Sequence, residues 1–325
     1  MQDNDIKQAS QDTPLIFDTS DGQQLRINTV NTYLRKKFGG KIIKLAVDGG
    51  FTCPNRDGSK GTGGCLFCSS SGSGDMASGS GDISADLTSQ IRLLSGKWPD
   101  ARYMAYFQSH TNTYAPASEL RDKFLPALDF PDVVGIAIAT RPDCLPDDVV
   151  ELLSEINQKT FMWVELGLQT IHEKTSEAMN LCYSVKEYDD AVRKLTEKNI
   201  PVVTHLILGL PGESREMMLD SVKHVCRQDI WGIKLHMFNL VKGSRMEKSY
   251  PDYISFSSID EYVDLAIDAL ELIPPGIVVH RISGDAPRST LIHPEWSYRK
   301  RTILNSIHRK LRERNTWQGR RASIL

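Results

Sequence analysis

The sequence predicts an α/β protein built on a mostly parallel sheet, and three observations support this prediction. Six apolar segments of strand length lie between residues 42 and 240, and an amphipathic helical segment of about 8–15 residues precedes each of the last five. Such alternation is typical of right-handed βαβ units. Apolar residues form 40% of the 325 residues and charged residues 25%, which excludes a chain that is disordered throughout. The pattern fits either an open, doubly wound sheet or a partial barrel.

The first elements expected are a helix at residues 29–38, which Gly39 and Gly40 close, and a strand at residues 42–47. Residues 49–81 follow, rich in glycine and serine and without hydrophobic periodicity. A loop of this length inside a compact domain is usually functional or disordered.

Helices and strands then alternate through the middle of the chain. Helices are expected at residues 87–94, 118–128, 146–156, 185–198 and 214–227, and strands at 102–107, 133–139, 161–168, 201–208 and 232–240. A further helix at 258–272, a short strand at 276–282 and a terminal helix at 298–314 form an extension. No Gly-x-Gly-x-x-Gly pattern follows the first strand, which disfavours a dinucleotide-binding fold.

The sequence shows no signal of secretion or membrane insertion. The longest apolar run, residues 133–139, is far shorter than the ~20 residues that span a bilayer. Residues 1–20 are polar and acidic and lack the basic and apolar regions of a secretory signal. We therefore expect a cytoplasmic protein that does not contact a membrane.

Three of the six cysteines, Cys53, Cys65 and Cys68, lie within sixteen residues directly after the first strand. In a cytoplasmic chain, clustered thiols bind metal more often than they form disulfides. Structural zinc usually takes four protein ligands, whereas a cubane iron–sulfur cluster held by three thiolates offers one open iron. A fourth zinc ligand from His110, His205 or His236 stays open as an alternative. Cys144, Cys182 and Cys226 are isolated and are expected to be small buried side chains.

Residues 48–58 (DGGFTCPNRDG) and 63–68 (GGCLFC) resemble the cluster loop of radical S-adenosylmethionine (SAM) enzymes. The resemblance is greatest to the YhcC/YtqA-type family, which is related to the radical domain of the Elongator catalytic subunit and to oxygen-independent coproporphyrinogen oxidase. Further similar segments follow in the same order at residues 139–143 (ATRPD), 164–170 (VELGLQT), 204–213 (THLILGLPGE) and 234–244.

The resemblance implies a partial (β/α)6 TIM-like barrel with N- and C-terminal extensions, and places the cofactors at the carboxyl ends of its strands. It divides the chain into an N-terminal extension at residues 1–40, a radical SAM core at 41–245 and a C-terminal extension with a basic terminal helix at 246–325. It also implies that Cys53, Cys65 and Cys68 hold a 4Fe–4S cluster. An electron from a reducing donor would then allow cleavage of SAM to a 5′-deoxyadenosyl radical.

Four polar residues are candidates for contacts to SAM. Glu165 and Gln169 are four residues apart on a strand, so both point to one face, where each needs a hydrogen-bond partner or a ligand. Arg141 and His205 are the other two candidates, although Arg141 and the proline after it could simply end a strand, and His205 could be a core histidine with a hydrogen-bond partner. Backbone amides of residues 61–64 are expected to approach the cluster. Related enzymes have an arginine near Leu181, so no role is assigned there, and no catalytic residue is assigned.

The last 27 residues, 299–325, carry a net charge of +8, and the rest of the chain carries −10. This basic segment and its aromatic residues Trp296, Tyr298 and Trp317 favour an anionic partner, although a solvated helix explains the charge equally well. With the resemblance, it points to tRNA, modified at C5 of wobble uridine. The alternatives are a radical reaction on a small metabolite or a porphyrin-like molecule and, in another class, a non-catalytic zinc- or cluster-binding module.

Overall fold

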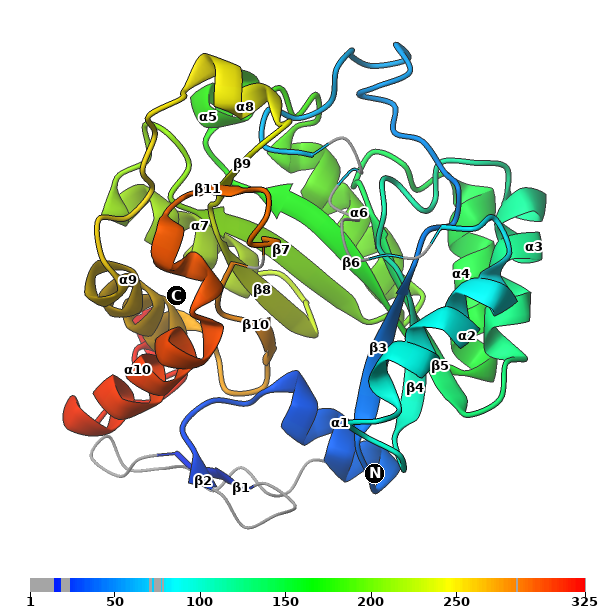
Figure 1. The fold of residues 1–325 in the computed structure, drawn as a ribbon, viewed down its shortest axis with the longest axis horizontal. Helices are drawn as coiled ribbons and strands as arrows, with labels where there is room; N and C mark the ends of the chain where they lie inside the picture. Colours follow the sequence, from blue (N-terminus) through cyan, green and yellow to red (C-terminus); the bar gives the residue numbers. More distant parts are fainter. Residues whose placement is uncertain are drawn as a thin grey trace.

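The computed structural model of the chain describes residues 15–18, 24–69, 72, 77, 79–284 and 286–324. Seven parallel strands form its main sheet, which curls into a half-barrel (Figure 1). In spatial order they are β3 (Ile42–Val47), β4 (Arg102–Phe107), β5 (Val133–Thr140), β6 (Phe161–Gln169), β7 (Val202–Leu208), β8 (Gly232–Met237) and β10 (Val278–Arg281). The partial TIM-like barrel predicted from the sequence is confirmed.

One strand of the sheet comes from the segment that the sequence analysis assigned to the C-terminal extension. β10 pairs in parallel with β8, with Val278 opposite Gly232 and Val279 opposite Ile233. Helix α9 (Ile259–Leu272) precedes it, so the helix–strand alternation continues for one more unit. The expected strand at 232–240 ends at Met237, and Leu240–Val241 instead forms β9, which pairs with β11 (Leu291–His293).

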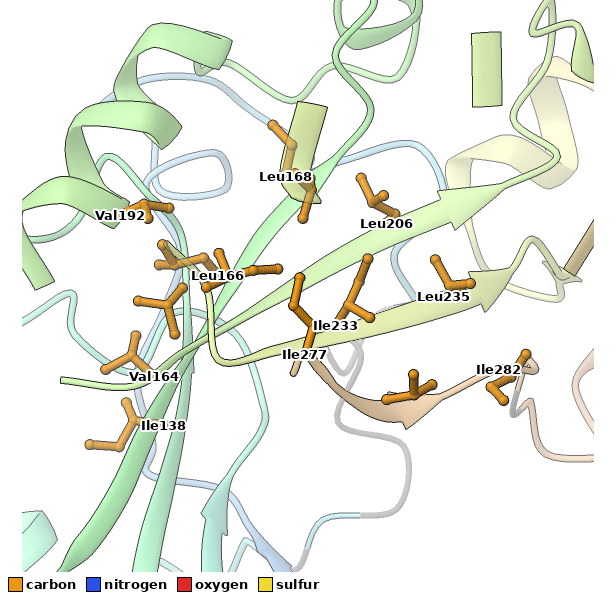
Figure 2. Close-up of a cluster of buried hydrophobic side chains, with 14 of the residues drawn as sticks. Ile138, Val164, Leu166, Leu168, Val192, Leu206, Ile233, Leu235, Ile277 and Ile282 are labelled. Atoms are coloured by element: carbon orange, nitrogen blue, oxygen red, sulfur yellow. The ribbon is translucent and has the colours of Figure 1, made fainter. Parts of the chain in front are cut away.

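Helices cover the convex face of the sheet. They are α2 (Ile83–Leu94), α3 (Ala117–Leu128), α4 (Asp147–Lys159), α6 (Val185–Glu197), α7 (Arg215–Cys226) and α9, with two short helices, α5 (Glu173–Ala178) and α8 (Arg245–Ser249), between them. Alternate strand residues such as Val164, Leu166 and Leu206 point to these helices and are fully buried (Figure 2). The intervening residues of each strand therefore face the hollow of the half-barrel.

Aromatic side chains close the hollow at the amino ends of the strands. Tyr33 of α1 (Val30–Phe38) lies with its ring centroid 5.1 Å from that of Trp231, which in turn contacts Phe161, Trp163 and His280. Such edge-to-face contacts add to the free energy of burying the rings. In the part of the chain that the structure describes, the hollow therefore opens toward the carboxyl ends of the strands.

The two terminal segments pack together on the edge of the sheet at β10. On the N-terminal side are β1 (Phe17–Asp18), β2 (Gln24–Leu25) and the segment leading to α1, and on the C-terminal side η1 (Glu295–Tyr298), α10 (Lys300–Glu313) and η2 (Ala322–Ile324). The buried Gln318 accepts from the Asn28 amide at 2.8 Å and donates to the Ile277 carbonyl at 2.7 Å. No helix in the described ranges combines the length and the apolar character that crossing a bilayer requires.

Candidate active site at the carboxyl ends of the strands

A cavity of about 280 Å³ occupies the open end of the half-barrel. Its walls come from the segments that follow β3, β4, β5, β8 and β10 and from inward-facing residues of β6 and β7. All seven residues that the sequence analysis named as cofactor ligands or contacts line this one cavity: Cys53, Cys65, Cys68, Arg141, Glu165, Gln169 and His205. Residues up to 152 positions apart in the chain therefore meet at one site.

The cysteine-bearing loop folds through hydrogen bonds among its own backbone groups. The amides of Gly61 and Gly64 donate to the carbonyls of Pro54 and Asn55, at 3.1 and 2.7 Å. These two amides are therefore used to close the loop, and the approach of the amides of residues 61–64 to a cluster stays a prediction. Gly64 has φ +76°, and a Cβ there would lie 2.9 Å from Nε of Arg56, so the tight turn favours glycine.

A second loop holds the cysteine loop in place. The side-chain amide of Asn180 donates to the Gly64 carbonyl at 2.9 Å, and Arg245 donates to the same oxygen at 3.0 Å. The Leu66 amide donates to the Met179 carbonyl at 3.0 Å. Asn180 adopts a left-handed backbone, with φ +55°, which asparagine tolerates better than most residues. The sequence analysis assigned no role to this loop.

Arg141 is buried and directs its guanidinium at protein groups. It forms a two-pronged ion pair with Asp143, at 2.9 and 2.8 Å, and donates to the Leu181 carbonyl at 2.9 Å. It also lies 4.7 Å from the ring centre of Tyr183. Burial opposes its charge, but the hydrogen bonds and charge of Asp143 raise its pKa further above the ordinary value. An arginine thus does brace the segment around Leu181, although it comes from the end of β5.

Glu165 lies at the floor of the cavity and is fully buried. Its carboxylate accepts hydrogen bonds from Tyr106 Oη at 2.7 Å, Trp163 Nε1 at 2.9 Å, His205 Nε2 at 2.9 Å and Lys234 Nζ, and Lys44 Nζ is 3.8 Å away. Burial alone would raise the pKa of Glu165, but the ammonium groups of Lys234 and Lys44 hold it well below its ordinary range. The floor therefore contains an ionised carboxylate surrounded by donors.

His205 and Gln169 stand between this floor and the cysteine loop. Burial and the charge of Lys234 lower the pKa of His205 to about 4, so its ring is neutral at pH 7 and donates to Glu165. Gln169 ends β6 with φ +71°, and its amide lies over Gly167, where a Cβ would come within 2.6 Å of Nε2. Glu165, Gly167 and Gln169 thus occupy one face of β6, as strand alternation predicts.

The sequence analysis missed Tyr106, Lys234 and Lys44, which complete the floor. One signal was present, because Lys44 interrupts an otherwise apolar strand and Lys234 lies in a strand whose other residues, apart from His236, are apolar or glycine. A lysine in a buried strand requires a partner of opposite charge. The partner itself lies more than sixty residues away in both cases, and only the folded sheet identifies it as Glu165.

Several buried polar atoms of the cavity wall have no hydrogen-bond partner among the described residues. They are His110 Nδ1 and Thr111 Oγ1 beyond β4, and His236 Nε2 and Asn239 Oδ1 at the end of β8. Buried polar atoms nearly always have partners in folded proteins. A ligand with several polar groups would satisfy them, and the three thiols offer soft donors for iron. The residues present therefore fit an iron–sulfur cluster together with a polar cofactor such as SAM.

Comparison with known proteins agrees with this geometry. The radical SAM superfamily profile matches residues 56–225, and the profile of its C-terminal domain matches residues 230–313. The chain is 48% identical to the uncharacterized protein YtqA of Bacillus subtilis, over 91% of this chain and 92% of that one. It is 36% identical to YhcC of Escherichia coli, over 89% and 94% of the two chains.

The fold also resembles that of a larger protein. The structure of Elp3 from the archaeon Methanocaldococcus infernus superimposes with a TM-score of 0.63 at 16% identity, over 85% of this chain. This chain spans 64% of that structure, and so less than two thirds of the archaeal protein. The likeness therefore shows a shared fold over most of this chain.

Members of the superfamily use a 4Fe–4S cluster and SAM. The profile match covers more than half of the chain, and the relatives match along nearly their whole length. The chain is thus an enzyme rather than a non-catalytic module, its cofactors are a 4Fe–4S cluster and SAM, and it belongs to the radical SAM superfamily.

Proposed function

We propose that Cys53, Cys65 and Cys68 are the cluster ligands and that SAM occupies the cavity beside them. With both cofactors bound and an electron from a reducing partner, the site supplies a 5′-deoxyadenosyl radical that abstracts hydrogen from substrate. We propose that Gln169, which ends β6 and lines the cavity, contacts SAM directly. In this proposal Glu165 and His205 form the floor of the cavity below SAM. Arg141 contributes indirectly, because it holds the loop at Leu181 in place.

Substitution of single cysteines tests the ligand assignment. Cys65→Ala leaves two thiolates, which cannot replace three, so we expect anaerobically reconstituted protein to fall from about four irons per chain to nearly none. The control is Cys226→Ala, because Cys226 is buried among the apolar residues behind β7 and should not affect iron content. Full iron content in Cys65→Ala would show that this ligand is misassigned.

We further propose that the substrate is tRNA, modified at C5 of the wobble uridine in the cytoplasm. The supporting observation is a cationic and aromatic surface beside the cavity. Arg288 and Arg299 lie over the exposed ring of Tyr298, at 4.7 and 5.8 Å from its centre. Ala286 lines the cavity, and two residues of chain span no more than about 7 Å, so Arg288 lies close to the rim. Cations bind phosphates, and aromatic rings stack on bases.

Only some of the cations in the basic C-terminal segment are exposed and available to bind phosphates of tRNA. Lys310, Arg314 and Arg321 pair with carboxylates of α9, namely Asp264, Asp268 and Glu271. Trp317 is 5% exposed, and Arg320 covers its ring at 4.6 Å, so the expectation that Trp317 stacks on a base is wrong. Among the cations of this segment, Arg299, Arg301 and Arg312 are exposed and form no ion pair with a described carboxylate.

The triple variant Arg299→Ala, Arg301→Ala, Arg312→Ala tests the tRNA surface. We expect weaker tRNA binding and a salt dependence reduced by about 2–3 in the slope of log K against log [salt], because each lost phosphate contact contributes about 0.9. The control removes the same charge from α6 and its C-terminal cap, where the cations are paired with carboxylates: Lys186→Ala, Arg193→Ala, Lys198→Ala. Wild-type binding without salt sensitivity, or equal loss in both variants, would contradict the proposal.

A small metabolite or a porphyrin-like molecule is the second candidate substrate. The observation that favours it is the pairing of α10 and its flanking residues with α9, which gives much of the positive charge a structural role. Mass spectrometry of tRNA nucleosides from cells with and without the protein separates the two. A missing wobble-uridine derivative supports tRNA, and an unchanged profile supports the small molecule.

A further inference from the structure

Asn55 lies inside the cysteine loop, and its side chain joins Cys65 of that loop to the neighbouring loop at residues 180–182. Its side chain is fully buried, and its Nδ2 lies 3.6 Å from Cys65 Sγ. The same amide nitrogen donates to the Asn180 carbonyl. The oxygen Oδ1 accepts from Asn180 Nδ2 at 3.3 Å and from Cys182 Sγ at 3.3 Å. Both the nitrogen and the oxygen of the Asn55 side-chain amide therefore have hydrogen-bond partners.

These contacts also determine which way the amide group is oriented. A backbone carbonyl only accepts hydrogen bonds, so the atom that faces the Asn180 carbonyl must be the NH2 group. The opposite atom faces a thiol and a second amide NH2, both of which donate. The second N–H of Asn55 is therefore directed at Cys65 Sγ.

We propose that Asn55 is a positioning residue that raises the reduction potential of the 4Fe–4S cluster through an N–H···S hydrogen bond to Cys65. This inference rests on Cys65 being a cluster ligand, as proposed above, and not on the identity of the substrate. Reduction adds negative charge that spreads onto the ligand sulfurs. An N–H dipole directed at a sulfur stabilises the reduced state more than the oxidised state.

Glycine at position 61 leaves the space that this arrangement requires. A Cβ on Gly61 would lie 2.3 Å from Asn55 Oδ1 and 2.9 Å from Cys182 Sγ. Gly61 has no positive φ, so alanine is acceptable to its backbone, and its methyl group must displace the amide or the thiol. Gly61→Ala is thus a way to disturb the N–H···S contact without removing its donor.

The test is a redox titration of reconstituted protein, followed by the paramagnetic signal of the reduced cluster, with iron content measured in the same samples. In Asn55→Ala we expect the reduced state to be destabilised about tenfold relative to the oxidised state, a shift of about 59 mV to more negative potential for one electron. Gly61→Ala should shift the potential in the same direction by less. Both should cleave SAM more slowly at a fixed, poised potential.

The control is Asn180→Gly, which keeps the left-handed backbone and the backbone carbonyl that orients the Asn55 amide. It removes the side-chain bonds to the Gly64 carbonyl and to Asn55 Oδ1 without removing the donor from the sulfur. We expect it to lower stability and keep the wild-type potential. An unchanged potential in iron-replete Asn55→Ala, or an equal shift in Asn180→Gly, would overturn the proposal.

If Asn55→Ala does not bind iron, Gly61→Ala decides the question. Failure of both to bind iron would overturn it too, since Asn55 would then only hold the loop. Full iron in Cys65→Ala would instead refute the ligand assignment.

Discussion

The residues at the floor of the cavity show how a carboxylate is kept charged inside a protein. Glu165 is fully buried, yet three neutral donors and two lysines surround it. Desolvating an ion costs several kcal/mol, which its partners must offset. Removing one partner of such a group therefore lowers the free energy of unfolding by more than the contact distance alone would suggest.

His205 makes the stability of the protein depend on pH. Its pKa is about 4 in the folded chain and about 6.5 in an unfolded one, so between these values the unfolded state binds more protons. Stability therefore falls as the pH drops from 6.5 toward 4, and the low pKa of Glu165 acts in the same direction in more acidic solution.

In His205→Gln, which keeps a donor for Glu165, we expect the free energy of unfolding to depend less steeply on pH in that window. The slope should decrease by up to about 1.4 kcal/mol per pH unit. Urea unfolding of the cluster-free protein at several pH values measures it. Identical slopes for the variant and the wild type would show that His205 does not titrate in this way.

At the scale of elements, α10 is a structural helix with one polar face. Ile303, Ile307 and Leu311 are fully buried against α9, while its basic residues pair with α9 or face outward. Positions 303, 307 and 311 are each four residues apart and form one stripe. Deleting residues 299–325 would therefore expose core surface, and only point variants test the role of the charges.

Ile307→Ala should lower the free energy of unfolding by about 2–5 kcal/mol, because it leaves a cavity between α10 and α9. Asn305→Ala, on the exposed side of the same helix, should change it by no more than about 0.5 kcal/mol. Denaturant unfolding compares the two. Equal effects would mean that α10 does not contribute its apolar face to the core.

At the scale of the whole molecule, the well-packed sheet and the less extensively packed cysteine loop meet at the cavity. The sheet and its helices share one large apolar cluster, whereas the cysteine loop packs Leu66 and its two neighbours into a smaller, separate one. The loop is also held by hydrogen bonds that Asn180 and Arg245 donate and by one that the Met179 carbonyl accepts. Binding a cluster adds three strong links to this loop and stabilises the state that binds it.

Oxidative removal of the cluster with a chelator should therefore loosen the cysteine loop and leave the sheet intact. We expect amide hydrogen exchange at residues 55–68 to accelerate at least about tenfold, with exchange in β6 and β7 unchanged, because local openings differ in free energy across a fold. Mass spectrometry of exchanged peptides measures both. Uniform acceleration along the chain would indicate that the cluster stabilises the whole fold.

Most of the fold could be predicted from the sequence, because hydrophobic periodicity is a property of neighbouring residues. The helix–strand alternation gave the parallel sheet, and β3 to β7 lie within two residues of their predicted bounds. The strand at 276–282 was predicted, but as part of an extension and not of the main sheet. Its place in the sheet depends on how α9 crosses to the sheet edge, which the local sequence does not show. The sequence also identified the clustered thiols and the inward-facing Glu165 and Gln169.

By itself, the sequence determined the class of fold and the cluster of three cysteines, because these follow from local pattern and spacing, and its motifs showed the family by their resemblance to known ones. Only the tertiary structure decided which groups meet: Lys234 with Glu165, Arg141 with the loop at Leu181, and Asn55 with Cys65. Such pairs are joined by the curl of the sheet and the path of its loops, and buried charges and polar atoms take whichever partners that geometry brings within reach.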